Sequence, residues 1–353
     1  MGVSIASIKQ SIFRVLEYAL AFLVIISLNF ALPRMMPGDP FLHLSGEVDE
    51  VLTFYSQKQV QYFREYYGLD RPIHEQFLTY LKELAVGDLG FSYYYKEKVS
   101  TIILDRLPWT VFLVVSAMAL SLILGIALGS YSAWRRNQWQ DQVLYTVLIV
   151  FSEIPAFLVG LALLIGLAAG LGWFPLAGAA TPFAGYSSVW EKIVDILHHA
   201  ALPILTLTLA RTGGIYLLVR NSLGTVLTKD YMVTARAKGL KEFRIRYLHA
   251  LRNALMPLFT RVAIQLGALL GGAILAENVF SYPGLGLLMR SAVVVRDYPL
   301  IQGIFLVLAV GVMAANMLAD LAYKYIDPRT RPAAGLKPGA ALPLPAGGEK
   351  GDA

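Results

Sequence analysis

Glu153, Arg211 and Glu277 are ionisable side chains within long apolar stretches of the chain, and the amide of Asn278 directly follows the last of them. Charged groups inside a bilayer are costly, and they usually face a bundle interior or a wet cavity. There they can meet a charged solute or pair with each other. We treat these four residues as candidates for a translocation path. An interhelical ion pair that fixes packing is the alternative role for Arg211 and Glu153.

Enzyme chemistry is not indicated. The chain has no cysteine, which excludes disulfides, thiolate ligands and thiol nucleophiles. Its five histidines are scattered, apart from the adjacent His198 and His199, and form no convincing metal site. The sequence contains no phosphate-binding Gly-x-x-x-x-Gly-Lys-Ser/Thr loop, no His-Glu-x-x-His and no Gly-x-Ser-x-Gly. We therefore predict no catalytic residue, no metal and no cofactor on this chain.

A basic segment at 220–256 is instead suited to binding a partner at the surface. From Arg220 to Leu255 it has eight Lys and Arg against two acids. Asp230 can cap a short helix that starts at Tyr231, and Gly239 can supply the left-handed residue that ends it. A second helix is predicted from about Glu242. Such a rigid basic unit is suited to a groove on a partner protein, while contact with anionic lipid headgroups alone is the other interpretation.

The composition places these residues in a membrane protein. The chain is 56% hydrophobic and 15% charged, with a mean hydropathy of +0.57, whereas a soluble chain has roughly 25% charged residues. A spanning helix needs about 20 mainly apolar residues. Pro155 is expected to kink the third of the segments that qualify. The predicted fold is all-α with six membrane helices, over 12–33, 108–131, 143–172, 200–221, 257–279 and 301–323.

Charge sets the predicted topology. An even number of spans places both termini on one side, together with Arg135, Arg136 and the basic segment, so that side is predicted to be cytoplasmic. The loop 34–107 has eight Lys and Arg against eleven Asp and Glu, which is consistent with an outside location. The net charge of +6 is thus explained by topology and not by nucleic acid. The predicted units are 1–33 with the first helix, an extracytoplasmic subdomain at 34–107, a five-helix core at 108–331 and a disordered cytoplasmic tail at 332–353.

The basic segment also carries a family resemblance. The string Tyr-x-x-Thr-Ala-Arg-Ala-Lys-Gly-Leu at 231–240, with Arg-x-Ser before it and a later Pro257, resembles the coupling-loop signature of ABC importer permeases. It is most similar to the B-type permease subunit of dipeptide, oligopeptide and nickel uptake systems. Val-Thr-Ala at 233–235 stands where the general signature has Glu-Ala-Ala. Further matching strings lie at 36–40, 68–72, 87–90 and 277–286, and the resemblance covers about 10–331.

The resemblance implies a type I ABC importer permease fold and one half of a transport pore. It implies a second permease subunit of C type, two cytoplasmic ABC ATPases that carry the ATP and Mg²⁺, and an extracytoplasmic substrate-binding protein. The substrate would be a di- or oligopeptide, with nickel or an oligosaccharide as alternatives within the family. The location would be the cytoplasmic membrane of a bacterium or archaeon. The residues implied to contact an ATPase are Asp230, Tyr231, Thr234, Ala235, Arg236, Ala237, Lys238, Gly239 and Leu240.

Two other classes of protein are weighed against this interpretation. A secondary transporter driven by an ion gradient would use Glu153, Arg211 and Glu277 as a relay. Such folds usually have repeats with broken helices in matching halves, and they need no coupling unit. A membrane scaffold or receptor component is disfavoured by the charges inside the apolar stretches. A neighbouring gene for a P-loop ATPase would discriminate among the three.

Overall fold

The computed structural model describes residues 5–36 and 57–326, and in those ranges every regular element is helical apart from one bridge between Phe91 and Lys98. The helices are α1 (Ile5–Arg34), α2 (Gln57–Tyr66), α3 (Ile73–Ala85), α4 (Val99–Trp134), α5 (Trp139–Glu153), α6 (Ala156–Leu163), the π-helix η1 (Leu164–Gly170), α7 (Val189–Leu227), α8 (Asp230–Ala237), α9 (Glu242–Arg244), the π-helix η2 (Ile245–Leu251), α10 (Arg252–Ala254), α11 (Met256–Val279), α12 (Leu285–Val294) and α13 (Tyr298–Ile326). The all-α prediction is confirmed.

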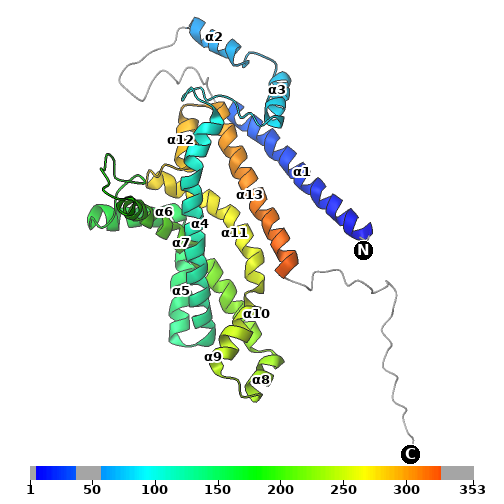
Figure 1. Ribbon diagram of the computed structural model, residues 1–353, viewed down its shortest axis with the longest axis vertical. Coiled ribbons are helices and arrows are strands. Elements are labelled where there is room, and N and C mark those ends of the chain that lie inside the picture. The colour runs from blue at the N-terminus through cyan, green and yellow to red at the C-terminus, as the bar shows by residue number, and fades with distance from the viewer. Residues whose placement is uncertain (1–4, 37–56, 327–353) are drawn as a thin grey trace, which may run out of the picture.

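The long apolar helices run between two distinct ends of the molecule. In Figure 1, α2 and α3 lie at one end and α8 and α9 at the other, while α4 extends from the first end toward the second. The helices α2 and α3 of the predicted outside loop and the predicted cytoplasmic segment are therefore far apart in space. The predicted tail 332–353 lies outside the described residues, and the division into four units stays a prediction.

Four of the predicted spans coincide with helices that are long and apolar enough to cross a bilayer, namely Leu16–Arg34, Val99–Trp134, Val189–Leu227 and Tyr298–Met317. The pair α5 and α6–η1 makes a fifth if it counts as one broken span. The remaining predicted span, 257–279, coincides with α11, which has 24 residues. The total of six spans stays a prediction.

Pro155 produces a sharper break than the predicted kink. Helix α5 ends at Glu153, Pro155 immediately precedes α6, and the axes of the two parts differ by 101°. Proline lacks the N–H that would continue the helix and clashes with the preceding turn. The chain therefore turns almost at right angles within a stretch that is apolar throughout.

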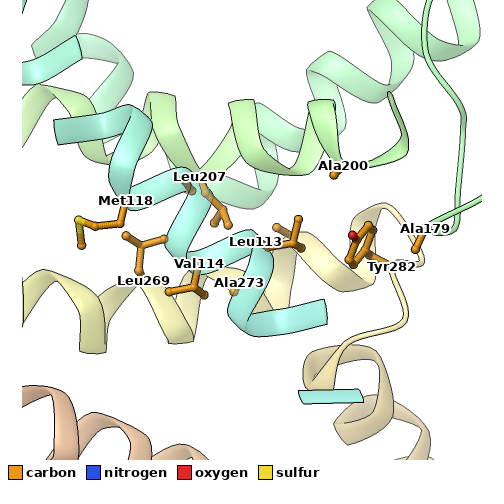
Figure 2. Packing of buried hydrophobic residues seen from close by; sticks show 11 residues of the cluster. Leu113, Val114, Met118, Ala179, Ala200, Leu207, Leu269, Ala273 and Tyr282 are labelled. Carbon is orange, nitrogen blue, oxygen red and sulfur yellow. The ribbon is translucent and has the colours of Figure 1, made fainter. Parts of the chain in front are cut away.

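The core forms where α4, α7 and α11 meet. Figure 2 shows Leu113 and Met118 of α4, Leu207 of α7 and Leu269 of α11 pointing toward one another. Farther along α4, the pair Gly125 and Gly129 lets its backbone approach α7 closely. A Cβ atom at Gly129 would lie 2.8 Å from the main-chain oxygen of Tyr216. Small residues four apart permit such a crossing between membrane helices, so α4 and α7 pack as one unit.

Candidate functional site

Helix α8 is fixed to the bundle by its inner face. Met232 is fully buried and Ala235 nearly so, and both pack in a cluster with Ala133 of α4, Leu223 of α7 and Ile245 of η2. Burying an apolar side chain of this size contributes about 1.5–3 kcal/mol. We call residues 230–251, which comprise α8, α9 and η2, the α8–η2 unit. Its position relative to the bundle is therefore set by packing.

The end of α8 confirms the predicted role of Gly239. Its φ of +72° is left-handed, its N–H donates to Arg236 O at 2.9 Å, and the N–H of Leu240 donates to Ala235 O at 3.4 Å. These two bonds form a Schellman motif, in which glycine avoids the cost that a Cβ would impose. The predicted cap at the other end is wrong. Lys229 precedes the helix without a side-chain cap, and Asp230 lies in the first turn, where its charge favours the helix dipole.

The ion pairs on the surface of the α8–η2 unit contribute little to its stability. Glu242 accepts from Arg236 at 3.1 Å and pairs with Arg246 at 3.5 Å, and about half of each side chain is exposed. Exposed pairs of this kind contribute about 0–1 kcal/mol. The ring of Tyr247 packs against Trp134 of α4 with centroids 4.9 Å apart, and continues the contact with the bundle.

The outer face of the α8–η2 unit combines apolar and cationic side chains. Val233 is 63% and Phe243 74% exposed, and Tyr231, Arg236 and Lys238 are exposed beside them. Of the nine residues predicted to contact a partner, Ala235 instead packs inward and Leu240 is half-buried. The exposed members are Asp230, Tyr231, Thr234, Arg236, Ala237, Lys238 and Gly239.

A buried ion pair lies at the base of this unit, and the sequence reasoning missed it. Arg220 of α7 donates from Nε and Nη2 to the two carboxylate oxygens of Asp141, each at 2.7 Å. Ser132 of α4 also donates to Asp141, and Tyr216 contacts Ser132 at 2.6 Å. The carboxylate is only 1% exposed, so the pair joins α4, α5 and α7 within the protein. Asp141 lies just before the expected third span, among polar residues, so nothing in the sequence indicated that it would be buried.

Glu277 and Asn278 are held at the opposite end of the bundle. Glu277 is fully buried, and accepts from Thr110 of α4 at 2.7 Å and from the N–H of Gly286 at 2.5 Å. Asn278 donates to Ile274 O at 2.7 Å and to Gly286 O at 3.2 Å. Both side chains therefore bind the backbone at the start of α12. They fix the turn between α11 and α12 against α4.

The other two candidates for the path lie elsewhere. Arg211 is half-buried on α7 and faces α11, with Nη2 3.8 Å from where a Cβ of Gly272 would stand. Glu153 is exposed at the end of α5, just before the break at Pro155. The structure thus brings Glu277 and Asn278 together, and places Glu153 in a different setting.

In the part of the chain that the structure describes, no group of three His, Cys, Asp or Glu residues is arranged to hold a metal.

A bundle of long apolar helices, with a rigid basic unit at one end and small helices at the other, defines a polytopic membrane component. A sequence model of the family described as "Binding-protein-dependent transport system inner membrane component" matches residues 125–332. The N-terminal model, "Binding-prot-dependent transport system membrane comp, N-term", matches 8–114. The chain belongs to this family. It is the transmembrane permease subunit of an ABC importer, whose ATPase is a separate subunit.

Named relatives agree with this assignment. A "Putative peptide permease protein" of Brucella ovis is 37% identical over 305 residues, which cover 86% of this chain and 93% of the relative. The "Glutathione transport system permease protein GsiC" of Pectobacterium atrosepticum is 37% identical over 318 residues, or 90% and 97% of the two chains. The same-named protein of Salmonella choleraesuis is 35% identical over 319 residues, again 90% and 97%. The resemblance found in the sequence is confirmed.

Among solved structures, an inward-facing form of the MetNI methionine ABC transporter is similar. The TM-score is 0.50 at 16% identity, and the match covers 64% of this chain and 96% of the other. At that identity the likeness shows the fold alone. It places the α-helical core within the architecture of ABC importer permeases.

Proposed function

We propose that this permease imports di- or oligopeptides across the cytoplasmic membrane of a bacterium or archaeon, with both of its termini cytoplasmic. The names of the relatives support a peptide substrate, since they are a peptide permease and glutathione permeases. The other half of the pore is a distinct C-type permease. An extracytoplasmic binding protein delivers the peptide at the end that carries α2 and α3.

The observation that carries the mechanism is the outer face of the α8–η2 unit. Val233 and Tyr231 of α8 and Phe243 of α9 are exposed to solvent, while the inner face of α8 is packed into the bundle. Exposed apolar side chains on a rigid support are suited to bury against a partner. We infer that one of two cytoplasmic ABC ATPases, which hold the ATP and Mg²⁺, grips this face. Closure of the ATPases then moves the bundle between inward- and outward-facing states.

The function is tested by reconstitution. The permease alone in liposomes should neither hydrolyse ATP nor accumulate a peptide such as trialanine. With the C-type permease, both ATPases and the binding protein, ATP should drive accumulation. The matched control is the same complex with ATP replaced by a non-hydrolysable analogue. Accumulation driven by a proton or sodium gradient, without the ATPases, would contradict the proposal and favour a secondary transporter.

We assign Arg211 to the translocation path. A full charge at the bilayer centre costs about 2.5–3.5 kcal/mol on insertion scales, so a half-buried arginine at a helix crossing needs a function or a structural role. It faces α11, whereas Glu277 and Asn278 on the same helix bind the backbone of α12. Glu277 and Asn278 then support the path by fixing the position of its outer wall. Glu153 is exposed, so it can contact solute or solvent.

Arg211→Gln separates a path role from a packing role. If Arg211 meets the carboxylate of a peptide, its loss should remove a charge-assisted hydrogen bond of about 1.5–3 kcal/mol and reduce flux about 10- to 100-fold. Basal ATP hydrolysis and Tm should stay unchanged. The measurements are uptake and Tm for Arg211→Gln alone and combined with Glu153→Gln or Glu277→Gln. A lower Tm that either second change restores, with normal flux, would instead establish a packing ion pair.

A further inference from the structure

A pocket of about 300 Å³ lies at the end of the molecule that carries α2 and α3. Its walls come from the end of α1, the turn after α2, helix α3, the loop before α4 and the start of α13. None of the residues discussed for transport or for ATPase contact lines it. Its volume is at the small end of the range for small-molecule sites, which begins at about 300 Å³.

Charges of opposite sign lie at the two ends of this pocket. Helix α3 contributes Gln76, Tyr80 and Glu83 in a row to its lining. At one end Gln76 accepts from Nε of Arg34 at 3.1 Å and donates to the main-chain oxygen of Arg71 at 2.8 Å. The seven residues from Gln76 to Glu83 correspond to about 10 Å along a helix axis. The Arg34 guanidinium is therefore held beside Gln76, about two helical turns from Glu83 along α3.

The acidic end holds two carboxylates. The chain turns back after α3, with the N–H of Asp88 donating to Glu83 O at 2.9 Å, and both side chains line the pocket. Partial burial, and then the charge of Asp88, raise the pKa of Glu83 above its usual value. Two neighbouring acids favour a cation beside them, because a positive group relieves their repulsion.

The pocket is also lined by an unused hydrogen-bond donor. Gln302 of α13 lines it and is 7% exposed, and among the described residues Nε2 of Gln302 has no hydrogen-bond partner. Its main-chain oxygen accepts from Asn29 at 2.8 Å, and Asn29 also donates to Tyr80 at 3.3 Å. The backbone of Gln302 is thus connected through Asn29 to Tyr80 of α3. A buried donor without an acceptor is costly, which points to an acceptor that arrives with a ligand.

The walls are held in place independently of any ligand. Asp297, fully buried just before α13, accepts from Ser92, from the N–H of Tyr94 at 3.1 Å and from the N–H of Leu300 at 3.3 Å. Burial raises the pKa of Asp297, while these donors favour its charged form. On the other side, the guanidinium of Arg34 lies 3.7 Å from the ring centroid of Phe30. The pocket is therefore preformed.

We propose that this pocket binds a peptide of two or three residues as its zwitterion. The peptide carboxylate lies at Arg34 and Arg71, its ammonium lies at Glu83 and Asp88, and an internal carbonyl accepts from Gln302. An extended chain covers about 3.3–3.6 Å per residue, so two or three residues reach about 7–10 Å, which is comparable with the spacing of Gln76 and Glu83 along α3. The peptide class rests on the proposed function, but the charges and the orphan donor do not. The permease thus has a peptide site of its own outside the membrane core.

The test uses the assembled complex in lipid nanodiscs without the binding protein, titrated with trialanine by calorimetry. We expect saturable binding by the unmodified complex and none of N-acetyl-trialanine amide, which lacks both charges. Gln302→Leu should weaken binding by at least about tenfold. It should leave Tm equal or higher, because it removes an unpaired donor. Glu83→Gln with Asp88→Asn should weaken binding similarly.

A matched control locates the site. Glu75→Gln changes an acid on the same helix that does not line the pocket, and this variant should bind trialanine normally. Equal affinity for the capped peptide, or normal affinity in Gln302→Leu, would overturn the proposal. Trialanine that binds here to a complex that imports no peptide would refute the proposed function but not this site. Peptide import by a complex that does not bind trialanine at this pocket would refute the site but not the proposed function.

Discussion

The double variant Tyr231→Glu/Val233→Glu is expected to abolish ATP-driven uptake while the permease still folds and inserts. Both side chains are exposed, at 45% and 63%, on the face that we assign to the ATPase. Anchors of an interface each contribute about 2 kcal/mol or more, so losing two should weaken docking by over about 100-fold. Glutamate in the first turn favours the helix dipole, so α8 itself should persist. Met232 and Ala235 still hold it to the bundle.

A matched control lies at the start of α7. Val189 and Trp190 are also an exposed aliphatic–aromatic pair in the first turn of a helix, at 77% and 71% exposure. The measurements are retention of the ATPases during purification, peptide-stimulated ATP hydrolysis and uptake. Val189→Glu/Trp190→Glu should retain the ATPases. Normal retention and uptake in the Tyr231/Val233 variant would show that the ATPase binds elsewhere.

The largest expected loss of stability follows from Arg220→Met. This change leaves the carboxylate of Asp141 buried without its bidentate partner, and breaking a buried pair in this way costs about 3–5 kcal/mol. Ser132 and the N–H of Asn137 would still donate to it, but neither brings a positive charge. Tm of the purified permease should fall markedly. Asp141→Asn added to Arg220→Met should recover part of the loss, because the buried charge is then gone.

The exposed pair of Arg236 and Glu242 provides the comparison. Arg236→Met removes the same functional group from a pair in which each side chain is about half exposed, and should cost about 0–1 kcal/mol. Equal shifts in Tm for Arg220→Met and Arg236→Met would contradict the view that burial gives the Asp141 pair its importance. A double variant that is no more stable than Arg220→Met alone would also count against it.

Most features that depend on local sequence were predicted well, although the cap by Asp230 was not. The left-handed glycine at 239 follows from the residue type, and most of the apolar spans follow from length and hydropathy. The break at Pro155 was placed correctly, but its size was not, because the angle depends on how the two parts pack. Helix α4 begins at Val99 and not at 108. Its first turns are amphipathic, and their inner face packs on α12 and α13.

Features that depend on contacts across the fold were not predictable. The composition of α8 does not indicate that Ala235 faces inward. In the structure Ala235 is buried, while its neighbours Thr234 and Arg236 are exposed. Glu277 stood out as a charge in an apolar stretch, but its partner Thr110 is 167 residues away and the Gly286 N–H belongs to the next helix. The partner of Arg220 was missed for the same reason. Periodicity identifies a face, but only the fold decides what that face meets.

The close crossing of α4 and α7 has a mechanical consequence. Helix α7 has 39 residues and therefore extends about 58 Å, from a loop at one end to the base of α8 at the other. Because Gly129 brings α4 into backbone contact with it, the two helices resist bending separately. A tilt of about 10° about one end would sweep the other through ~10 Å, as follows from that length. The two helices thus act as a lever, in which a small rotation at the α8–η2 unit produces a displacement of about 10 Å at the opposite end of α7.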